Sequence, residues 1–289
     1  MQIRKLAFFW LMLCYSGVVN AACEASVVSL EPTNSAANYD VFATGNYPLR
    51  QQFKVRTSVS EGCKVVVVLD LENDVSALTN ATRESMRFDW YAAEGYLQAD
   101  KWLLELDSEN TEAEFEFRFI GGQWLEAGTY KNRLRASLFK ENSAMEMDQM
   151  TLNVEVSVLP SARIQFYGLS QRHFNLDLGS LKSNKIINYA PRLWVESTAP
   201  YSLSVDSQFN GKLRHQSQNA MWDLDYQMLI ANEAIPLDGT QRRWTRSHST
   251  AGTPLPIQII IGDTERKAGG KYSDTVHISI APSLSMAPD

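Results

Sequence analysis

Alternating apolar and polar positions dominate the chain and predict β-strands. In residues 112–120 three phenylalanines alternate with charged side chains, which is the period of two expected of a half-buried strand. The same alternation covers 52–60, 130–138 and 151–158, whereas the valine-rich run 64–71 predicts a strand buried on both faces. No apolar stripe of helical period exceeds two turns. We therefore predict an all-β protein of antiparallel, immunoglobulin-like sandwiches.

A proline marks the expected boundary between two such sandwiches. Pro160 cannot donate a hydrogen bond to a strand ladder, and it follows the last strand of the first half directly. We predict an N-terminal domain at 23–159 and a C-terminal domain at 160–289. The strands expected in the second half cover residues 163–167, 192–196, 201–206, 222–230, 256–261 and 271–280.

One short motif occurs in both halves. Residues 126–130 end in Gly-Thr-Tyr and residues 268–272 end in Gly-Lys-Tyr, and each opens a predicted strand. Two copies of one module is the economical interpretation. The alternative is chance similarity of a turn.

The two halves differ on the C-terminal side of this motif. The first continues through a loop, 140–149, into a full alternating strand, whereas the second has only residues 281–289 left. That tail has two prolines, and its only large apolar residues are Leu284 and Met286, too few for a sandwich strand. We therefore expect the C-terminal sandwich to lack its last strand.

A sandwich that lacks an edge strand exposes a groove with unpaired backbone groups, which is a template for a strand from another chain. Filling the groove with four or five apolar side chains would contribute about 6–12 kcal/mol before ordering costs. We assign this donor-strand acceptor groove to apolar residues of the first and last strands of the domain, namely Ile164, Phe166, Val276, Ile278 and Ile280.

Composition agrees with two folded domains. The chain has 289 residues, 44% of them hydrophobic and 21% charged, which excludes collagen, long disordered tails and multispan membrane proteins. Lysine and arginine total 27 against 33 aspartate and glutamate, a net charge of −6. This balance argues against nucleic acid as a partner.

The N-terminus predicts export. Arg4 and Lys5 precede an apolar run at 6–15 and small residues at 19–22, the pattern of a signal peptide covering residues 1–22. The run is too short to span a membrane, and no later stretch has 18 consecutive apolar residues, so we expect no membrane span.

Two cysteines remain after removal of that segment. In an exported chain, Cys23 and Cys63 predict one disulfide, which would contribute about 3–4 kcal/mol by closing a loop. The alternative is that Cys23 is lipidated, as in bacterial lipoproteins. That alternative would leave Cys63 without a partner.

Several segments of the second half carry a family resemblance. The run 268–280, together with 176–179, 201–205 and 210–213, resembles spore coat protein U-type domains, the pilin domains of archaic chaperone-usher fimbriae. The resemblance covers about 161–282. The first half matches more weakly, through its two cysteines and the Ala-Gly-Thr-Tyr turn. Unlike the family's usual pilin domains, the second half has no cysteine.

The resemblance implies an incomplete pilin domain held first by a periplasmic chaperone and then by the donor strand of an adjacent subunit, with export through an outer-membrane usher. A shaft pilin would also carry a free donor arm before its disulfide cysteine, and none is expected ahead of Cys23. We therefore expect a two-domain adhesin at the fimbrial tip, outside the cell, that promotes attachment and biofilm formation without a cofactor.

Exposed aromatic and methionine side chains are the candidate ligand contacts of the N-terminal domain, because such groups stack on sugars or on wet apolar surfaces. The alternative for each is a place in the core. Whether the ligand is a host glycan, a protein or an abiotic surface stays open. The candidates are Trp90, Tyr91, Tyr96, Trp102, Met145 and Met147.

Enzymatic motifs are lacking: there is no Gly-x-Ser-x-Gly, His-Glu-x-x-His or phosphate-binding glycine loop. Asp223 and Asp225 would share a strand face, but a solvated face explains them better than a paired-carboxylate site. The same holds for a calcium site at residues 109–116. We predict no enzyme. The alternative function is a self-contained exported β-sandwich binding protein or hydrolase, completed by its own tail.

Overall fold

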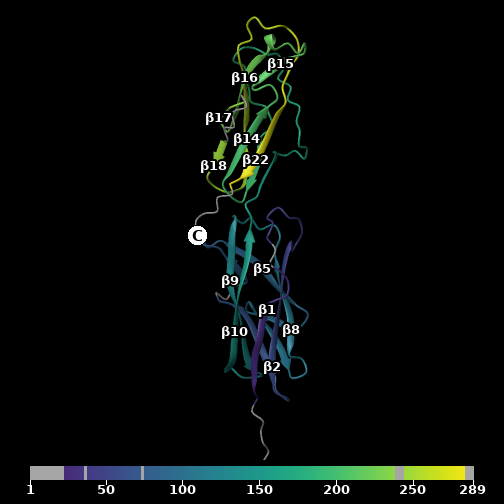
Figure 1. Cartoon of the computed structure of the whole chain (residues 1–289), viewed down its shortest axis with the longest axis vertical. Helices are drawn as coiled ribbons and strands as arrows, with labels where there is room; N and C mark the ends of the chain where they lie inside the picture. The colour runs from purple at the N-terminus through teal and green to yellow at the C-terminus, as the bar shows by residue number, and fades with distance from the viewer. Residues whose placement is uncertain (1–22, 36–37, 73–74, 238–243, 284–289) are drawn as a thin grey trace, which may run out of the picture.

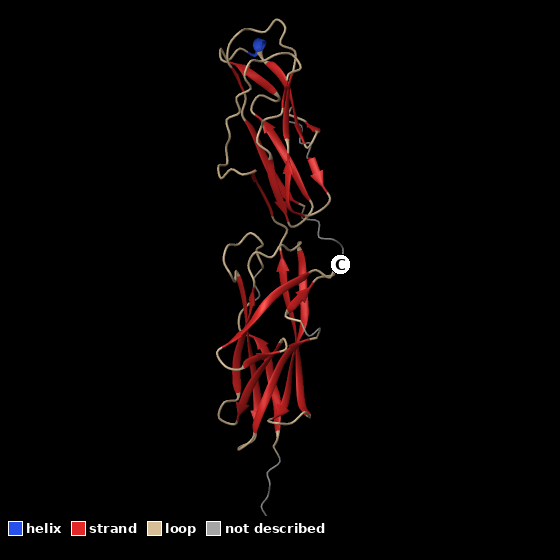
Figure 2. Ribbon diagram, turned by 180° about the vertical axis from the view of Figure 1, so that it is seen from behind, coloured by secondary structure: helices blue, strands red, loops and turns tan. Residues whose placement is uncertain are grey.

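The computed structural model describes residues 23–35, 38–72, 75–237 and 244–283. Two β-sandwich modules stack end to end into a rod, with strands running mostly along its long axis (Figures 1 and 2). The described part contains one short 3-10 turn, η1 (Ala220–Trp222), and is otherwise strands and loops. The predicted all-β class is confirmed. The predicted signal peptide, 1–22, and the tail residues Leu284 and Met286 lie outside the described residues.

The first module is formed by ten strands in two layers. One layer has the order β1-β2-β8-β5, and the other has the order β9-β3-β7-β6 with β10 on the far side of β9. The short β4 joins the layers by pairing with β5 and β9. The strands are β1 (Ala25–Pro32), β2 (Leu49–Val59), β3 (Lys64–Leu71), β4 (Ala77–Thr79), β5 (Ser85–Ala92), β6 (Tyr96–Gln98), β7 (Lys101–Asp107), β8 (Glu112–Phe119), β9 (Gly128–Lys140) and β10 (Glu146–Val158).

Aromatic side chains fill the interior of this module. The rings of Phe88 and Phe117 stack with centroids 4.0 Å apart, and Phe53 lies 4.8 Å from Phe117. Phe117 and Phe119 are fully buried, as the alternation of β8 predicts. Trp90 packs edge-on against Phe117 and donates its indole N–H to Ser76 Oγ at 3.0 Å. The period-two pattern therefore identified the core face correctly.

Three sequence expectations for this module were wrong or incomplete. The run Lys64–Leu71 is not buried on both faces, because Val65 and Val67 are fully buried while Val66 and Val68 stay half-exposed. The expected loop 140–149 is shorter, because β9 extends to Lys140 and β10 starts at Glu146. Strands β1, β4, β5, β6 and β7 were not predicted, although Met86, Phe88 and Trp90 of β5 alternate with exposed residues.

The second module contains the remaining twelve strands. Its sheets have the orders β11-β13-β19, β12-β20-β16-β15-β21 with β17 beside β16, and β18-β14-β22. The strands are β11 (Ala162–Phe166), β12 (Ile186–Ile187), β13 (Leu193–Ser197), β14 (Tyr201–Ser207), β15 (Lys212–His215), β16 (Leu224–Ile230), β17 (Glu233–Ile235), β18 (Trp244–Arg246), β19 (Thr250–Leu255), β20 (Ile257–Ile261), β21 (Tyr272–Ser273) and β22 (Val276–Pro282).

Each module has its own hydrophobic core. The buried cluster of the first module ends at Val158, and that of the second begins at Ile187, with Val195, Ile230 and Ile261 fully buried at its centre. No buried residue belongs to both clusters among the described residues. The chain therefore changes from one core to the other across Leu159–Ser161.

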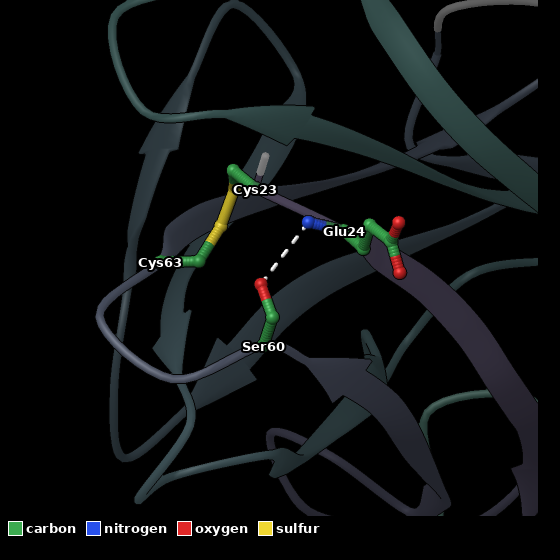
Figure 3. The surroundings of a disulfide bond; sticks show 4 residues. All are labelled: Cys23, Glu24, Ser60 and Cys63. Carbon is green, nitrogen blue, oxygen red and sulfur yellow. Dashed lines mark hydrogen bonds between the residues drawn. A yellow bond between two sulfur atoms is a disulfide. The ribbon is translucent and has the colours of Figure 1, made fainter. Parts of the chain in front are cut away.

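A disulfide joins Cys23 to Cys63, as the cysteine count predicts (Figure 3). It ties the segment just ahead of β1 to the residue before β3. Beside it, the Glu24 backbone N–H donates to Ser60 Oγ at 3.0 Å (Figure 3). The bond thus fixes β1 against the turn that follows β2.

The repeated Gly-x-Tyr motif makes the same contact in both modules. Tyr130 Oη donates to the carbonyl of Glu126 at 3.0 Å, and Tyr272 Oη donates to the carbonyl of Ala268 at 2.7 Å. This four-residue closure is the hydrogen bond of a tyrosine corner in immunoglobulin-like sandwiches. Tyr130 also contacts the Glu84 carboxylate, and burial together with that carboxylate raises the pKa of its phenol.

Thr198 organises the joint between the modules. Its side chain accepts the Ser161 N–H at 2.8 Å and donates to the Leu159 carbonyl at 3.0 Å. Its own carbonyl accepts the Ala127 N–H of the first module at 2.7 Å. Since Thr198 is 1% exposed, these bonds are shielded from water and hold the linker in one conformation.

The two tyrosines allow a matched test of this fold. Tyr130→Phe should destabilise the first module by about 1–3 kcal/mol, because it removes the hydrogen bonds of a fully buried phenol to the Glu84 carboxylate and the Glu126 carbonyl. Tyr272→Phe, at a half-exposed position, should cost the second module about 1 kcal/mol or less. Hydrogen–deuterium exchange of the two modules would measure both effects. Equal losses of stability in the two variants would contradict the larger role assigned to Tyr130.

Candidate strand-acceptor groove

Two strand edges in the second module face each other without a strand between them. Among the described residues, β11 pairs only with β13, and β22 pairs only with β14. Some residues of β11 and β22 approach within 8 Å, Cα to Cα, and no ladder joins them; because two strands that flank a third lie ~9.5 Å apart, an inserted strand would have to part β11 and β22 there. The free edges therefore leave backbone N–H and C=O groups available to a further strand.

The inward side chains of these two strands are incompletely covered. Ile164 and Phe166 of β11 are half-buried, in contrast to the fully buried Val195 on the neighbouring β13. On β22 the alternate residues Val276, Ile278 and Ile280 are half-buried in the same way. All five residues predicted for the acceptor groove thus lie along its two edges and pack against the second core.

An open cavity of about 870 Å³ extends from these edges into the core. Phe166, Val276 and Ile278 line it, whereas Ile164 and Ile280 lie outside its wall. Its deeper wall consists of side chains that already belong to the buried core, such as Leu213, Leu224, Met228 and Ile257. The apolar part of the lining suits the alternate side chains of an inserted strand, and the rest of the lining is polar.

Residues 174–181, called the leucine strap below, form one wall of the cavity. The sequence pattern did not assign this segment to the groove. Leu176 and Leu178 of this segment are half-buried against the core and line the cavity. Lys185 holds the strap by donating from Nζ to the carbonyls of Leu178 at 2.6 Å and Ser180 at 2.9 Å. The alternation of two leucines around Asp177 was the available signal.

The far end of the groove is polar. The Asp274 carboxylate accepts hydrogen bonds from Ser207 Oγ and Tyr226 Oη, both at 2.6 Å. Burial and this carboxylate raise the pKa of the Tyr226 phenol, so it stays a donor. Asp274 and Tyr226 both line the cavity, which gives the groove a polar end.

The candidate ligand contacts of the first module do not form one cluster. Trp90 takes the alternative place in the core, at 8% exposure. Tyr91 is exposed on β5 with Arg118 stacked on its ring, and Tyr96 is exposed on the β6–β7 hairpin. Half-exposed Trp102 lies on the same hairpin and donates to the Glu94 carbonyl. Met145 and Met147 are on the β9–β10 hairpin, with Met145 78% exposed.

The acidic candidates are engaged in ordinary ion pairs. Asp223 is buried and binds Arg214 at 2.6 Å, whereas Asp225 is exposed, so the two do not form a paired-carboxylate site. Glu116 pairs with Arg118, and Glu112 with Lys54 at 2.7 Å. The described residues contain no cluster suited to a metal ion. None of their helices is long and apolar enough to cross a bilayer.

Comparisons with known proteins found tip adhesins and subunits of chaperone-usher pili. A chain of the CsuC–CsuE chaperone–tip adhesion subunit complex of Acinetobacter baumannii matches with a TM-score of 0.47 and 15% identity, over 87% of this chain and 99% of that one. The CupB6 tip adhesin of Pseudomonas aeruginosa matches with a TM-score of 0.37 and 11% identity, over 90% and 96%.

A single-module match is the self-complemented MyfA fimbrial subunit of Yersinia enterocolitica, crystallised with galactose, with a TM-score of 0.32 and 13% identity over 48% of this chain and 98% of that one. No protein-family model and no curated protein matches the chain.

The open groove should bind a hydrophobic dye. Ile278→Asp places a charge among its apolar side chains and should strongly reduce the fluorescence of added 8-anilinonaphthalene-1-sulfonate. Val28→Asp is the control, because Val28 is a 58% exposed apolar residue of the first module. Equal fluorescence in both variants would mean that the dye binds elsewhere.

Proposed function

We propose that this chain is a fimbrial adhesin subunit with two domains, 23–159 for attachment and 160–289 for anchoring to the fibre. The anchoring domain accepts a β-strand from a neighbouring subunit in the groove between β11 and β22. The observation that carries the proposal is this pair of unpaired edges beside a cavity of about 870 Å³ whose lining is partly apolar and partly polar. Strand addition supplies backbone hydrogen bonds, and the cavity receives alternate side chains.

Strand insertion would cover half-buried side chains at the edge of the second core. An inserted strand would bury its own apolar side chains and cover Phe166, Val276 and Ile278, each now half-buried. Four such side chains contribute about 6–12 kcal/mol before ordering costs, at about 1.5–3 kcal/mol each. A domain with this groove empty is therefore destabilised and prone to edge-to-edge association. A periplasmic chaperone that fills the groove before assembly would also stabilise the domain and prevent edge-to-edge association.

The first strand of the chain supports a terminal position in the fibre. Within the described residues, the segment after Cys23 forms β1, which pairs along β2 and buries Val27 and Leu30 in its own module. This segment is therefore not a free donor arm. A subunit that accepts a strand without giving one from its described part fits a fibre tip, with the first domain facing outward and export through an outer-membrane usher.

The first domain suits adhesion to a surface without catalysis. Its candidate contacts are the exposed side chains Tyr91, Tyr96 and Met145, with half-exposed Trp102 and Met147. The second candidate function, a self-contained exported binding protein or hydrolase, requires residues after Ser283 to fill the groove. The two proposals differ in the effect expected from deleting 284–289.

The test appends a donor strand to the mature chain. A flexible linker and an alternating apolar segment after Asp289 should raise the midpoint of thermal unfolding of the second domain by about 10 °C or more, because a net gain of ~2 kcal/mol shifts a domain of this size by about that much. The control segment has the same composition in scrambled order. Differential scanning calorimetry measures both.

Two further variants make the outcome decisive. Ile278→Asp in the donor-appended chain should abolish the gain, since it places a charge under the inserted strand. Deleting 284–289 from the unmodified chain should leave its stability unchanged. A large loss on that deletion, or the same gain from the scrambled segment, would favour the self-contained alternative.

A further inference from the structure

Two aromatic side chains pack together on the outer face of the sheet β11-β13-β19 in the second module. Along β11 and β13 buried and more exposed positions alternate, so Tyr167, which directly follows β11, and Trp194 of β13 face away from the second core. Their ring centroids lie 5.3 Å apart, with an interplanar angle of 38°. Tyr167 stays 56% exposed. We call these two side chains the aromatic pair.

A glycine on the neighbouring strand fixes the position of this pair. Gly252 of β19 has a φ of +148°, and a Cβ on it would lie 2.0 Å from Cζ2 of Trp194 and 2.6 Å from its Cε2. The indole therefore lies directly against the backbone of β19, in space that a side chain at 252 would fill. The aromatic pair is thus supported from below by main chain and not by a flexible side chain.

Two hydrogen-bonding side chains flank the pair. Gln165 lies opposite Trp194 on β11, and Arg192 takes the outward position two residues before Trp194. Both are exposed, and neither side chain makes a hydrogen bond or ion pair with another described residue. An amide both donates and accepts hydrogen bonds, and a guanidinium donates them. The face thus offers donors and an acceptor beside an aromatic surface.

The apolar area of this face is small. Apart from Pro254, the outward neighbours of the pair are polar, namely Arg163, Gln165, Arg192 and Glu196. A standard protein–protein interface buries about 800 Å² on each partner and has an apolar centre, which two rings cannot supply. An aromatic surface of this size with a few polar groups at its border instead matches one sugar ring, whose C–H face stacks and whose hydroxyls donate and accept.

We propose that the anchoring domain carries a saccharide site on this face. One pyranose ring of a neutral glycan stacks on the aromatic pair, and its hydroxyls bind Gln165 and Arg192. A β-linked glucan suits the site, because equatorial hydroxyls leave the face of each ring flat and rich in C–H groups. No ionic ligand is required, since Arg163 and Glu196 pair with each other at 2.8 Å and a guanidinium also donates to neutral hydroxyls.

This site goes beyond the proposed function, which assigns attachment to the first domain. It lies on the opposite face of the sheet from the inward residues Ile164 and Phe166, so it needs no strand in the groove. Sugar binding is measured by titration of the mature chain, whereas the fibre role is tested by donor-strand stability. The two proposals can therefore fail separately.

The experiment titrates the isotope-labelled mature chain with cellotetraose and follows the indole N–H signals of its tryptophans by NMR. The Trp194 signal, identified by its loss in Trp194→Phe, should shift as the sugar binds. Sorbitol, which has hydroxyls but no ring, should leave it in place. Tyr167→Ala should weaken binding about three- to ten-fold, the effect of losing one stacked ring. Gln165→Ala should weaken it about two- to ten-fold, the effect of losing one neutral hydrogen bond.

Tyr189→Ala is the matched control for the tyrosine. Tyr189 lies in the same module and is 57% exposed against 56% for Tyr167, but it lies outside this sheet, where its phenol donates to the Asp177 carbonyl at 2.8 Å. Gln227→Ala, at an exposed position of β16, is the control for the glutamine. Both should leave the affinity within about two-fold, as expected of exposed residues outside the site.

Three results of the titration would overturn the proposal: no shift with cellotetraose, the same shift with sorbitol, or equal losses in Tyr167→Ala and Tyr189→Ala. Sedimentation showing a dimer that Tyr167→Lys dissociates would also overturn it, by assigning the face to a second copy.

Discussion

Backbone hydrogen bonding at two strand edges constrains the whole second module. A sandwich closes when every strand has neighbours that satisfy its N–H and C=O groups, and β11 and β22 each have one neighbour only among the described strands. The side chains beneath these edges are incompletely buried as well: Phe166 and Ile278 line the cavity and have no described strand over them. The first module shows the contrast. Its β10 pairs along nearly the whole of β9 and buries Val154 and Val156.

Hydrogen bonds fix two parts of the groove, its polar end and the leucine strap. Asp274 is held by Ser207 and Tyr226, so the groove is defined at that end by a fixed network and not by a loose loop. Along one side, Lys185 fixes the backbone of the strap so that Leu176 and Leu178 face the cavity. A strand inserted as proposed would meet a wall whose side chains are already positioned, which would reduce the ordering cost of binding.

The class of fold could be predicted because it depends on local alternation, whereas the acceptor groove stays a prediction. Phe115, Phe117 and Phe119 identify a core face by period alone, and all three are buried. The outer face of β3 could not be predicted in this way. A run of four valines has the same pattern whether its second face is covered or open, and the difference lies in the strands that pack, or fail to pack, above Val66 and Val68. Trp90 was ambiguous for a related reason, since its burial depends on Phe88 and Phe117 from paired strands.

The joint at Thr198 has a mechanical consequence. Strand β10 continues through Leu159–Ser161 into β11, so tension applied along the rod passes from one module to the other through this single crossing (Figure 1). Because β10 lies antiparallel along β9 for twelve residue pairs, such a pull loads those hydrogen bonds together and in shear, not one after another. The buried contacts of Thr198 with Leu159, Ser161 and Ala127 clamp the crossing itself. A rod built in this way resists stretching first at the joint between the two modules. It transmits the drag of an attached surface to β11, the strand that flanks the open groove.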